Sequence, residues 1–503
     1  MAGRQQDTLI RGHRFRRTGF SQLPETSILW LSGQLFDPAL SCKSVENDMQ
    51  KTDLPFGSRH IALELPDEVD ILSMGSPVAL DNPAQKIQEA LDSSIGGPGI
   101  DEIIRKKKEK IDDPTAVIVI SDNTRPVPYT GDQGILWPLV DRLLKQGVRA
   151  GKITVLVATG MHRGLTEAEI SKMIDPRVLD AGVQVKNHNC KNDKGLSYLG
   201  TTARGSEIYI NRFYMESDIR ILTGLVESHF MAGASGGRKS ICPGLIGEES
   251  TFVFHGAPMM AHPNTTDLLL EGNPCHEESF EVASTAGTDY IVNVTLDHQF
   301  KVTGVFAGEL KAAHEAAVEH LKSYTAVPYE GQYDIVLSHG GFVGINHYQV
   351  AKAGTVAARI IKPGGHVIML ADNTDTDPIG SLAYKTVLQI LTLSGPEAVE
   401  KILLSPDWTF IPEQWQVQMW TRLFKKIPID HFYYYSPQFG DAEYELTAGS
   451  RLSEMAGIPE SADPEVLVPK LVAAGIDKLK ELYTGSGEPR IAYLKDGPYG
   501  IPL

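Results

Sequence analysis

The run AVIVIS at Ala116–Ser121 is followed by ILWPLVDRLLKQGV at 135–148 and then by ITVLVA at Ile153–Ala158. The two β-branched runs predict short buried strands, and the apolar spacing between them predicts an amphipathic helix that ends at Gly147. A strand, a helix and a strand in this order form a βαβ unit, whose strands are parallel and covered on both faces. A third run, IRILT at 219–223, predicts another strand of the same kind.

A second series of the same kind follows in the C-terminal part of the chain. The run DYIVNVTLDHQFKVTGVFAGEL, which starts at Asp289, predicts a hairpin and then a helix through Lys322, and TAVPYEGQY at 325–333 predicts a linker. Beyond the linker, DIVLSHGG, GGHVIMLADN, HFYYYSP and RIAYLKDG predict strands, with helices from about Gln349 and near 412–426. This alternation predicts an α/β fold.

The linker divides the chain into two expected domains. We expect an N-terminal α/β domain over residues 56–325 that carries the main ligand site, a C-terminal α/β domain over residues 330–503, and a ligand crevice between the two. Residues 1–55 are polar and have no sustained period, so we expect an N-terminal extension that is partly disordered or draped over the body.

The composition argues against several classes of protein. The 503 residues include 47 basic and 63 acidic side chains, and the net charge of −16 disfavours nucleic acid and membrane surfaces as partners. We find no apolar run near the roughly 18 residues of a membrane-spanning helix and no secretory signal, so we expect a cytoplasmic protein. The cysteines are too scattered for a disulfide framework. They are Cys42, Cys190, Cys242 and Cys275.

Polar segments follow three of the predicted parallel strands. They are SDNTRP at 121–126, TGMHR at 159–163 and ESHFMAGASGGRKS at 227–240. Ligands of open α/β sheets bind beyond the carboxyl ends of the strands, because loops and helix N-termini meet at that edge. The three segments therefore predict one functional site at one edge of the sheet.

The first segment combines anion-binding features. Pro126 suits the first turn of a helix that Thr124 or Asn123 would cap, and free amides at such a terminus attract a phosphate or a carboxylate. Arg125 can hold a carboxylate bidentately, with Asp122 to orient the guanidinium. The alternative is an Asp–Arg ion pair that only closes a turn.

The glycine-rich segment is not a phosphate-binding P-loop. That motif needs glycine directly before the lysine, whereas Arg238 precedes Lys239, and Pro243 lies where the P-loop helix would run its first turns. A neighbouring positive charge and partial burial would lower the pKa of Lys239 and make its amine nucleophilic. This interpretation, a covalent lysine, competes with a lysine that merely contacts a phosphate.

Three histidines accompany these segments. His162 follows a strand, where a histidine is either a polar surface residue or an acid–base group. His229 lies ten residues before Lys239 and His255 sixteen residues after it, and neither spacing places them on one helix face. Imidazole suits nickel, copper, iron or zinc, but this spacing by itself does not indicate a metal site.

Together, SDNTRPVP, LVATGMHR, ESHFMAGASGGRKSICPG, the downstream His255, YQVAK and EQWQVQ resemble the nickel-pincer lactate racemase family. The resemblance runs in order from about residue 56 to the DG near the C-terminus. It implies an isomerase that interconverts the enantiomers of a 2-hydroxy acid, with lactate as the leading candidate. It also implies nickel and a pyridinium-3-thioamide-5-thiocarboxylic acid mononucleotide that is bound covalently to a lysine.

The resemblance assigns roles to single residues. Lys239 would carry the nucleotide, His255 would be the protein ligand of nickel, and His162 and His229 would be the two acid–base histidines. The remaining assigned residues are Thr124, Ser235 and Gly236 for the cofactor, and Asp122, Arg125, Gln349, Lys352 and Trp415 for the substrate, with Arg125 and Lys352 also counted as catalytic. Ala234 stands where the family has an aromatic residue, so we expect extra space for a larger hydroxy acid or for water.

The implied chemistry agrees with these residue types. Racemisation needs bases on both sides of the substrate, and removing the hydroxyl proton while a hydride passes to the cofactor avoids a carbanion and gives a flat 2-keto acid. The implied partners are a small anionic 2-hydroxy acid and the enzymes that make the cofactor. The alternatives are a lyase or hydratase that uses the same cofactor, and a non-catalytic protein that binds it.

Overall fold

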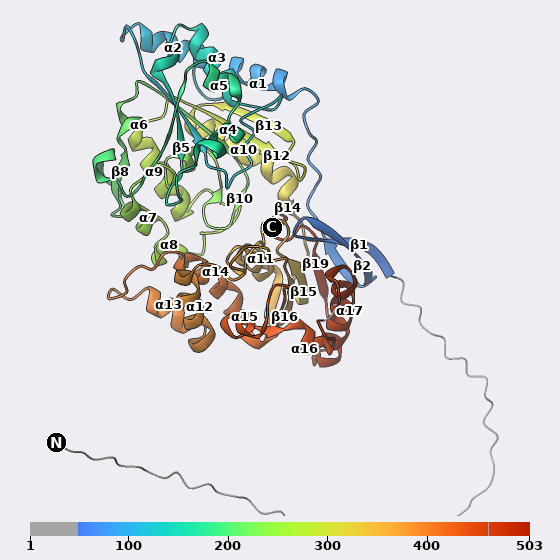
Figure 1. Ribbon diagram of the computed structural model, residues 1–503. Coiled ribbons are helices and arrows are strands. Elements are labelled where there is room, and N and C mark those ends of the chain that lie inside the picture. The colour runs from blue at the N-terminus through green and yellow to red at the C-terminus, as the bar shows by residue number, and fades with distance from the viewer. Residues whose placement is uncertain (1–48, 461) are drawn as a thin grey trace, which may run out of the picture. The chain divides into compact units, whose positions relative to one another are not determined.

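The structure is a computed structural model that describes residues 49–460 and 462–503 (Figure 1). Two six-stranded sheets organise these residues. We call residues 83–325, which are built on the first sheet, the first lobe. We call residues 49–72 and 326–503, which are built on the second sheet, the second lobe. Both sheets are accompanied by helices, which confirms the α/β fold class predicted from the sequence.

The first sheet contains the predicted βαβ unit. Its strand order is β13-β12-β9-β4-β5-β6, and β4 pairs in parallel with β5 on one side and with β9 on the other. Strand β13 pairs antiparallel with β12, so these two strands are the predicted hairpin. The strands are β4 (Ala116–Ser121), β5 (Ile153–Ala158), β6 (Gln184–Asn187), β9 (Ile219–Leu225), β12 (Tyr290–Leu296) and β13 (Val302–Gly308).

Helices bury both faces of the first sheet. In β4, Ile118 packs in one apolar cluster with Leu139, whereas Val119 points to the other face and packs in a cluster with Val282. A strand that is apolar at every position is therefore covered on both sides, as parallel sheets require. The helices of the first lobe are α1 (Pro83–Asp92), α2 (Ile100–Lys108), α3 (Leu136–Lys145), α4 (Glu167–Met173), α5 (Pro176–Asp180), α6 (Arg212–Glu216), α7 (Glu248–Phe254), α8 (Ala257–Ala261), α9 (Pro274–Ala286) and α10 (Leu310–Thr325).

The second sheet is parallel throughout, in the order β18-β17-β16-β15-β19-β3. Its strands are β3 (Val69–Leu72), β15 (Tyr333–His339), β16 (Ile361–Leu370), β17 (Phe432–Tyr435), β18 (Ser450–Arg451) and β19 (Ile491–Leu494). Its helices are α11 (His347–Ile360), α12 (Leu382–Ser394), α13 (Pro396–Leu403), α14 (Gln414–Phe424), α15 (Asp441–Leu446), α16 (Leu452–Ala456) and α17 (Pro464–Leu482).

The first described residues belong to the second lobe. Strands β1 (Met49–Phe56) and β2 (Arg59–Pro66) form a hairpin, and Leu54 packs in the same apolar cluster as Leu337 of the second sheet. Residues 49–55, which the sequence analysis assigned to an extension, therefore form a strand. Strand β3 pairs with β19, although the predicted boundary at residue 56 assigned it to the N-terminal domain. The rest of the expected extension, residues 1–48, lies outside the described residues.

The two lobes are joined by hydrogen bonds between α14 and the segment that surrounds α8. Gln418 donates to the carbonyl of Ala257 over 2.8 Å, and Arg422 donates to the carbonyls of Thr265 and Met260 over 2.5 and 2.8 Å. Three two-stranded sheets complete the fold: β7 (Leu196–Thr201) with β8 (Glu207–Asn211), β10 (Ser228–His229) with β11 (Gly233–Ala234), and β14 (Ala326–Val327) with β20 (Ile501–Pro502). Within the described ranges, the apolar length of every helix falls short of a membrane span.

Candidate active site

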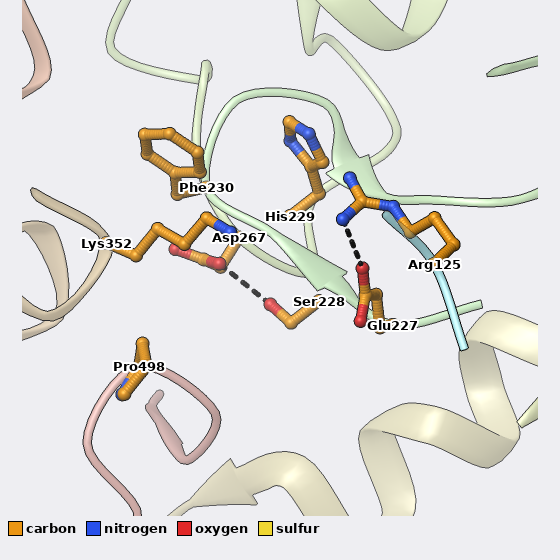
Figure 2. Close-up of a pocket in the computed structure, with 8 residues that line it drawn as sticks. All are labelled: Arg125, Glu227, Ser228, His229, Phe230, Asp267, Lys352 and Pro498. Atoms are coloured by element: carbon orange, nitrogen blue, oxygen red, sulfur yellow. Dashed lines mark hydrogen bonds and ion pairs between the residues drawn. The ribbon is translucent and has the colours of Figure 1, made fainter. Parts of the chain in front are cut away.

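A pocket lined from both lobes brings together several of the predicted residues (Figure 2). The loops that follow β4 and β9 supply the first-lobe side, because these adjacent parallel strands end at the same edge of the sheet. Helix α11 and the C-terminal segment supply the second-lobe side. The lining residues are Arg125, Glu227, Ser228, His229, Phe230, Asp267, Lys352 and Pro498.

The loop after β4 differs from the prediction. Residues 122–130 form a turn and an extended stretch, and the next helix, α3, begins only at Leu136, so the predicted helix N-terminus at Pro126 is wrong. Thr124 therefore caps no helix, and its hydroxyl donates to the carboxylate of Asp122 over 2.5 Å. Arg125 lies 3.3 Å from the carboxylate of Glu227, and this is the ion pair drawn in Figure 2.

Asp122 orients a histidine rather than Arg125. Its carboxylate lies 2.7 Å from Nδ1 of His162, on the loop after β5. Burial alone would raise the pKa of Asp122, but the hydrogen bonds from His162 and Thr124 outweigh it and keep the pKa below its usual value. An ionised carboxylate at Nδ1 holds the proton there, which leaves the Nε2 lone pair of His162 free to accept a proton.

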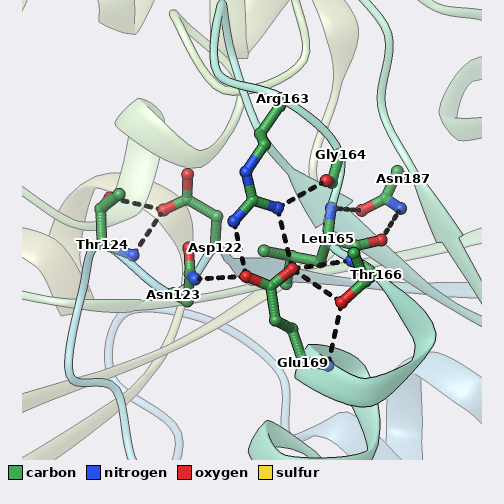
Figure 3. Close-up of polar contacts among 9 residues, drawn as sticks. All are labelled: Asp122, Asn123, Thr124, Arg163, Gly164, Leu165, Thr166, Glu169 and Asn187. Carbon is green, nitrogen blue, oxygen red and sulfur yellow. Dashed lines mark hydrogen bonds and ion pairs between the residues drawn. The ribbon is translucent and has the colours of Figure 1, made fainter.

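A polar network holds the loop that carries His162 (Figure 3). Arg163 donates to both carboxylate oxygens of Glu169 over 2.8 and 2.6 Å, and Asn123 of the neighbouring loop donates to the same carboxylate over 3.3 Å. Glu169 also completes the capping box of α4 with Thr166. The hydrogen bonds from Arg163 hold the pKa of Glu169 at about 2, so the carboxylate stays charged and links the loops after β4 and β5.

The glycine-rich loop brings His229 against Lys239. Strands β10 and β11 pair His229 with Gly233, and Lys239 lies in the short 3-10 helix Gly237–Ser240. The Lys239 amine lies 2.9 Å from Nε2 of His229, while the backbone N–H groups of Met231 and Ala232 each donate to Nδ1 over 3.2 Å. Because Nδ1 accepts, a neutral His229 carries its proton on Nε2, and this proton points at the lysine nitrogen.

The surroundings of Lys239 favour its neutral form. Burial and the positive charges of Arg125 and Arg238 lower the pKa of Lys239 to about 7. Burial and the nearby cations, Lys239 first, also lower the pKa of His229 well below its ordinary value. A neutral imidazole that donates to a neutral amine satisfies both groups, and an unprotonated lysine is the form that forms covalent bonds.

His255 is placed as a neutral imidazole beside an aromatic wall. It directly follows the last residue of α7, and its ring stacks on Trp415 of α14 with 4.5 Å between ring centroids. Trp415 is held in turn by a hydrogen bond of 3.0 Å from its indole to the hydroxyl of Tyr348. Burial and Lys239 lower the pKa of His255 to about 3, and its buried Nδ1 has no partner among the described residues.

Two predicted substrate-side residues lie on the first turns of α11. Gln349 and Lys352 are three positions apart and share one face of the helix, whose N-terminus is capped by Asn346. Burial and Arg125 lower the pKa of Lys352 to about 8, although Glu227 and Asp267 oppose the shift. Lys352 lines the pocket, whereas Gln349 does not, and the buried side-chain oxygen of Gln349 has no described partner.

Ser235 and Gly236 are buried residues of the glycine-rich loop. The hydroxyl of Ser235 donates to the carbonyl of Leu225 over 2.7 Å and accepts from the amide of Glu227 over 3.0 Å. Their assignment to the cofactor stays a prediction. Ala234 is fully buried in the core and is not among the lining residues of the pocket, and the expectation that it makes space for a larger substrate or for water stays a prediction.

Several lining residues have no role that the sequence predicts. Glu227 belongs to a quoted segment, but nothing in the sequence indicates its pairing with Arg125. Asp267 accepts a hydrogen bond of 2.7 Å from Ser228, and burial raises its pKa. Neither Asp267 nor Pro498 belongs to a recognisable local motif, since the fold brings each to the pocket from a distant part of the chain.

Two α/β lobes that jointly line a pocket of imidazole, amine, guanidinium and carboxylate groups define a two-lobed α/β enzyme. Residues 56–267 match the lactate racemase N-terminal domain, and residues 330–431 match the lactate racemase C-terminal domain. The chain therefore belongs to the lactate racemase family.

Individual relatives agree with this assignment. The chain is 31% identical over 382 residues to a lactate racemase of Lactiplantibacillus plantarum, and 28% identical over 380 residues to one of Thermoanaerobacterium thermosaccharolyticum. Each alignment covers 75% of this chain and 86% of the relative. The solved structure of the lactate racemase apoprotein from T. thermosaccharolyticum superimposes with a TM-score of 0.74 at 25% identity, covering 90% of this chain and 100% of that one.

Proposed function

We propose that this protein interconverts the enantiomers of lactate or of a closely related 2-hydroxy acid. The observation that carries the proposal is the meeting of Arg125, His229 and Lys352 in one pocket, with Lys239 hydrogen-bonded to His229. The matched relatives are named lactate racemase, an isomerase, and they cover most of the chain.

The cationic groups of the pocket suit a 2-hydroxy carboxylate. Arg125 presents a guanidinium that can hold the substrate carboxylate bidentately once the carboxylate displaces Glu227. Lys352, with a pKa of about 8, is largely protonated at neutral pH and can stabilise negative charge that develops on the substrate oxygen. The charged side chains thus provide both binding and orientation.

The two histidines supply the proton transfers. His162 has its Nδ1 proton fixed by Asp122, so its Nε2 can accept the proton of the substrate hydroxyl. His229 can act as a base at Nε2 only when its proton moves to Nδ1, which requires that the amides of Met231 and Ala232 release Nδ1. Each histidine would serve as base for one enantiomer and as acid for the other.

We include in the proposal the nickel-bound pyridinium-3-thioamide-5-thiocarboxylic acid mononucleotide, attached to Lys239. The residues present fit this group: Lys239 is a buried amine of lowered pKa, and His255 is a neutral imidazole with an unpartnered buried nitrogen. In the described part of the chain, no cluster of three or more His, Cys, Asp or Glu side chains could hold a metal ion by itself. His255 would therefore be the protein ligand while the nucleotide supplies the other ligands.

The nucleotide would supply hydride-transfer chemistry at C2 of the substrate. The side chains of the protein would hold the carboxylate, move the hydroxyl proton and keep the flat 2-keto acid in place.

The test uses protein that is co-produced with the cofactor-making enzymes and supplied with enantiopure lactate. Circular dichroism should show decay toward a racemic mixture from either enantiomer, and 2-deuterated lactate should keep its label while it inverts. Lys239→Ala serves as the control, because it removes the attachment point. Stable optical activity with loaded enzyme, or rapid loss of deuterium to water, would contradict the proposal.

A further inference from the structure

A second cavity lies behind Phe230, between the lobes. Its volume is about 150 Å³, several times the roughly 30 Å³ that one water occupies in the liquid. Phe230 is buried and lines both this cavity and the pocket described above, so the two spaces share one wall. The other lining residues are Thr266, Thr355, Ala358, Arg359, Arg422 and Lys426.

Three of these seven lining side chains are cationic, and none is acidic. Arg359 lies in the last turn of α11, whereas Arg422 and Lys426 come from the last turn of α14 and just beyond it. The protein has a net charge of −16, so three cations around one small cavity make this part of its surface locally positive in an otherwise acidic protein.

The guanidinium charges are bonded only to neutral oxygens. Arg359 donates to the carbonyl of Pro502 over 2.9 Å and to the hydroxyl of Thr266 over 2.6 Å. Arg422 donates to backbone carbonyls of the 260–265 segment. These contacts fix the two planar groups at the cavity without neutralising their charge.

Lys426 adds a charge without an ion-paired partner among the described residues, whereas the neighbouring Lys425 is paired with Glu400. Burial and the charge of Arg359 lower the pKa of Lys426, and burial also lowers the pKa of Arg422. Asp267 and Glu400 act on these cations from outside the cavity, Asp267 bonded to Ser228 and Glu400 to Lys425. Concentrated positive charge of this kind favours an anion with several oxygens, because each oxygen can accept from a different cation.

We propose that this cavity is a binding site for a phosphate group, held by Arg359, Arg422 and Lys426 and by the hydroxyl of Thr266. Thr266 belongs to the first lobe and the three cations to the second, so the ligand would bridge the lobes directly behind the wall of the active-site pocket. The phosphate can come from free inorganic phosphate or from a mononucleotide. No group assigned to the racemase reaction lines this cavity, so a site for free phosphate is independent of the racemase proposal, whereas a site for a mononucleotide rests on the proposed function.

The test is isothermal titration calorimetry of the full chain at low ionic strength, with inorganic phosphate and nicotinamide mononucleotide as probes. Lys426→Gln should weaken phosphate binding roughly tenfold or more, because it removes one charged donor. Lys426→Arg should retain most of the affinity. Lys470→Gln, which removes an exposed lysine of α17, is the charge-matched control and should bind as the unmodified protein does.

The two probes separate the sources of the phosphate group. Tighter binding of inorganic phosphate identifies a site for the free anion, and tighter binding of the mononucleotide that is equally sensitive to Lys426→Gln identifies a nucleotide phosphate. The absence of binding by either probe would overturn the proposal. So would binding that Lys426→Gln and Lys470→Gln weaken equally, since this would reflect net charge alone.

Discussion

Lys239 should react as a neutral amine at neutral pH. Burial, Arg125 and Arg238 lower its pKa from 10.5 to about 7. About half of Lys239 is then unprotonated at pH 7, whereas an exposed lysine with a pKa near 10.4 is unprotonated in about one molecule in 2,500. The direction follows from the sign of the shift: a lowered pKa means that the amine loses its proton at a lower pH.

The gain in reactivity is smaller than this ratio, because an amine of lower pKa is also a weaker nucleophile. With a Brønsted slope of about 0.4–0.5, as for thiols, lowering the pKa from near 10.4 to about 7 reduces the intrinsic reactivity roughly 25- to 50-fold. Dividing the gain of about 1,200-fold in free amine by this factor leaves Lys239 roughly 25- to 50-fold more reactive than an exposed lysine at pH 7.

The assay is competitive acetylation of the unloaded protein with trace acetic anhydride at a series of pH values, followed by mass spectrometry of the peptides. Lys470, which is exposed on α17, is the internal reference. Arg125→Gln removes a positive charge beside Lys239 and should move the midpoint of its reactivity to higher pH. Arg163→Gln is the matched control, because Arg163 is engaged with Glu169 instead. A midpoint near that of Lys470, unmoved by Arg125→Gln, would refute the reasoning.

Three further perturbations test the site and the loop that carries it. Asp122→Asn should lower the racemisation rate by roughly 10²–10⁴-fold, because it removes the carboxylate that fixes His162, the proposed acid–base histidine; a loss below about tenfold in a polarimetric assay would assign Asp122 to structure alone. His255→Ala should abolish bound nickel in metal analysis, while intact mass still shows the adduct on Lys239; retained nickel would exclude His255 as the ligand. Gly233→Ala should lower the free energy of unfolding by about 1–3 kcal/mol in urea denaturation, because at its φ of +77° a Cβ would lie 2.2 Å from the carbonyl oxygen of Leu269. An unchanged midpoint would show that the hairpin relaxes without cost.

Local sequence patterns predicted the central strands because these strands are buried on both faces. AVIVIS and ITVLVA are apolar along their whole length, and the structure places β4 and β5 at the predicted bounds. Strand β3 was missed because VDIL has only four residues and its partner β19 lies more than four hundred residues further along the chain. No local pattern reports a pairing over such a separation.

In the candidate site, too, the features set by neighbouring residues could be predicted, whereas contacts between distant parts of the chain could not. Strand ends located the three loops correctly, because parallel strands that are adjacent in a sheet end at one edge. The partner of Asp122 could not be predicted, since Arg125 is three positions away and His162 is forty, and only the conformation of the loop decides between them. No helix begins at Pro126, because the chain turns at residues 123–125 and then continues extended, with the Thr124 hydroxyl donating to Asp122.

The two histidines enter the proposed reaction from different starting states. His162 is fixed by a carboxylate at Nδ1 and presents a lone pair, whereas His229 is fixed by two backbone amides at Nδ1 and presents a proton to Lys239. Covalent attachment at Lys239 would remove the basic nitrogen that now accepts from His229, so loading of the cofactor would itself change the hydrogen bonding of the second base. The hydrogen bonding of His229 that keeps Lys239 nucleophilic before the cofactor is attached thus differs from the hydrogen bonding that the proposed racemisation would need afterwards. A proton shift within the single ring of His229 is the smallest change that connects the two.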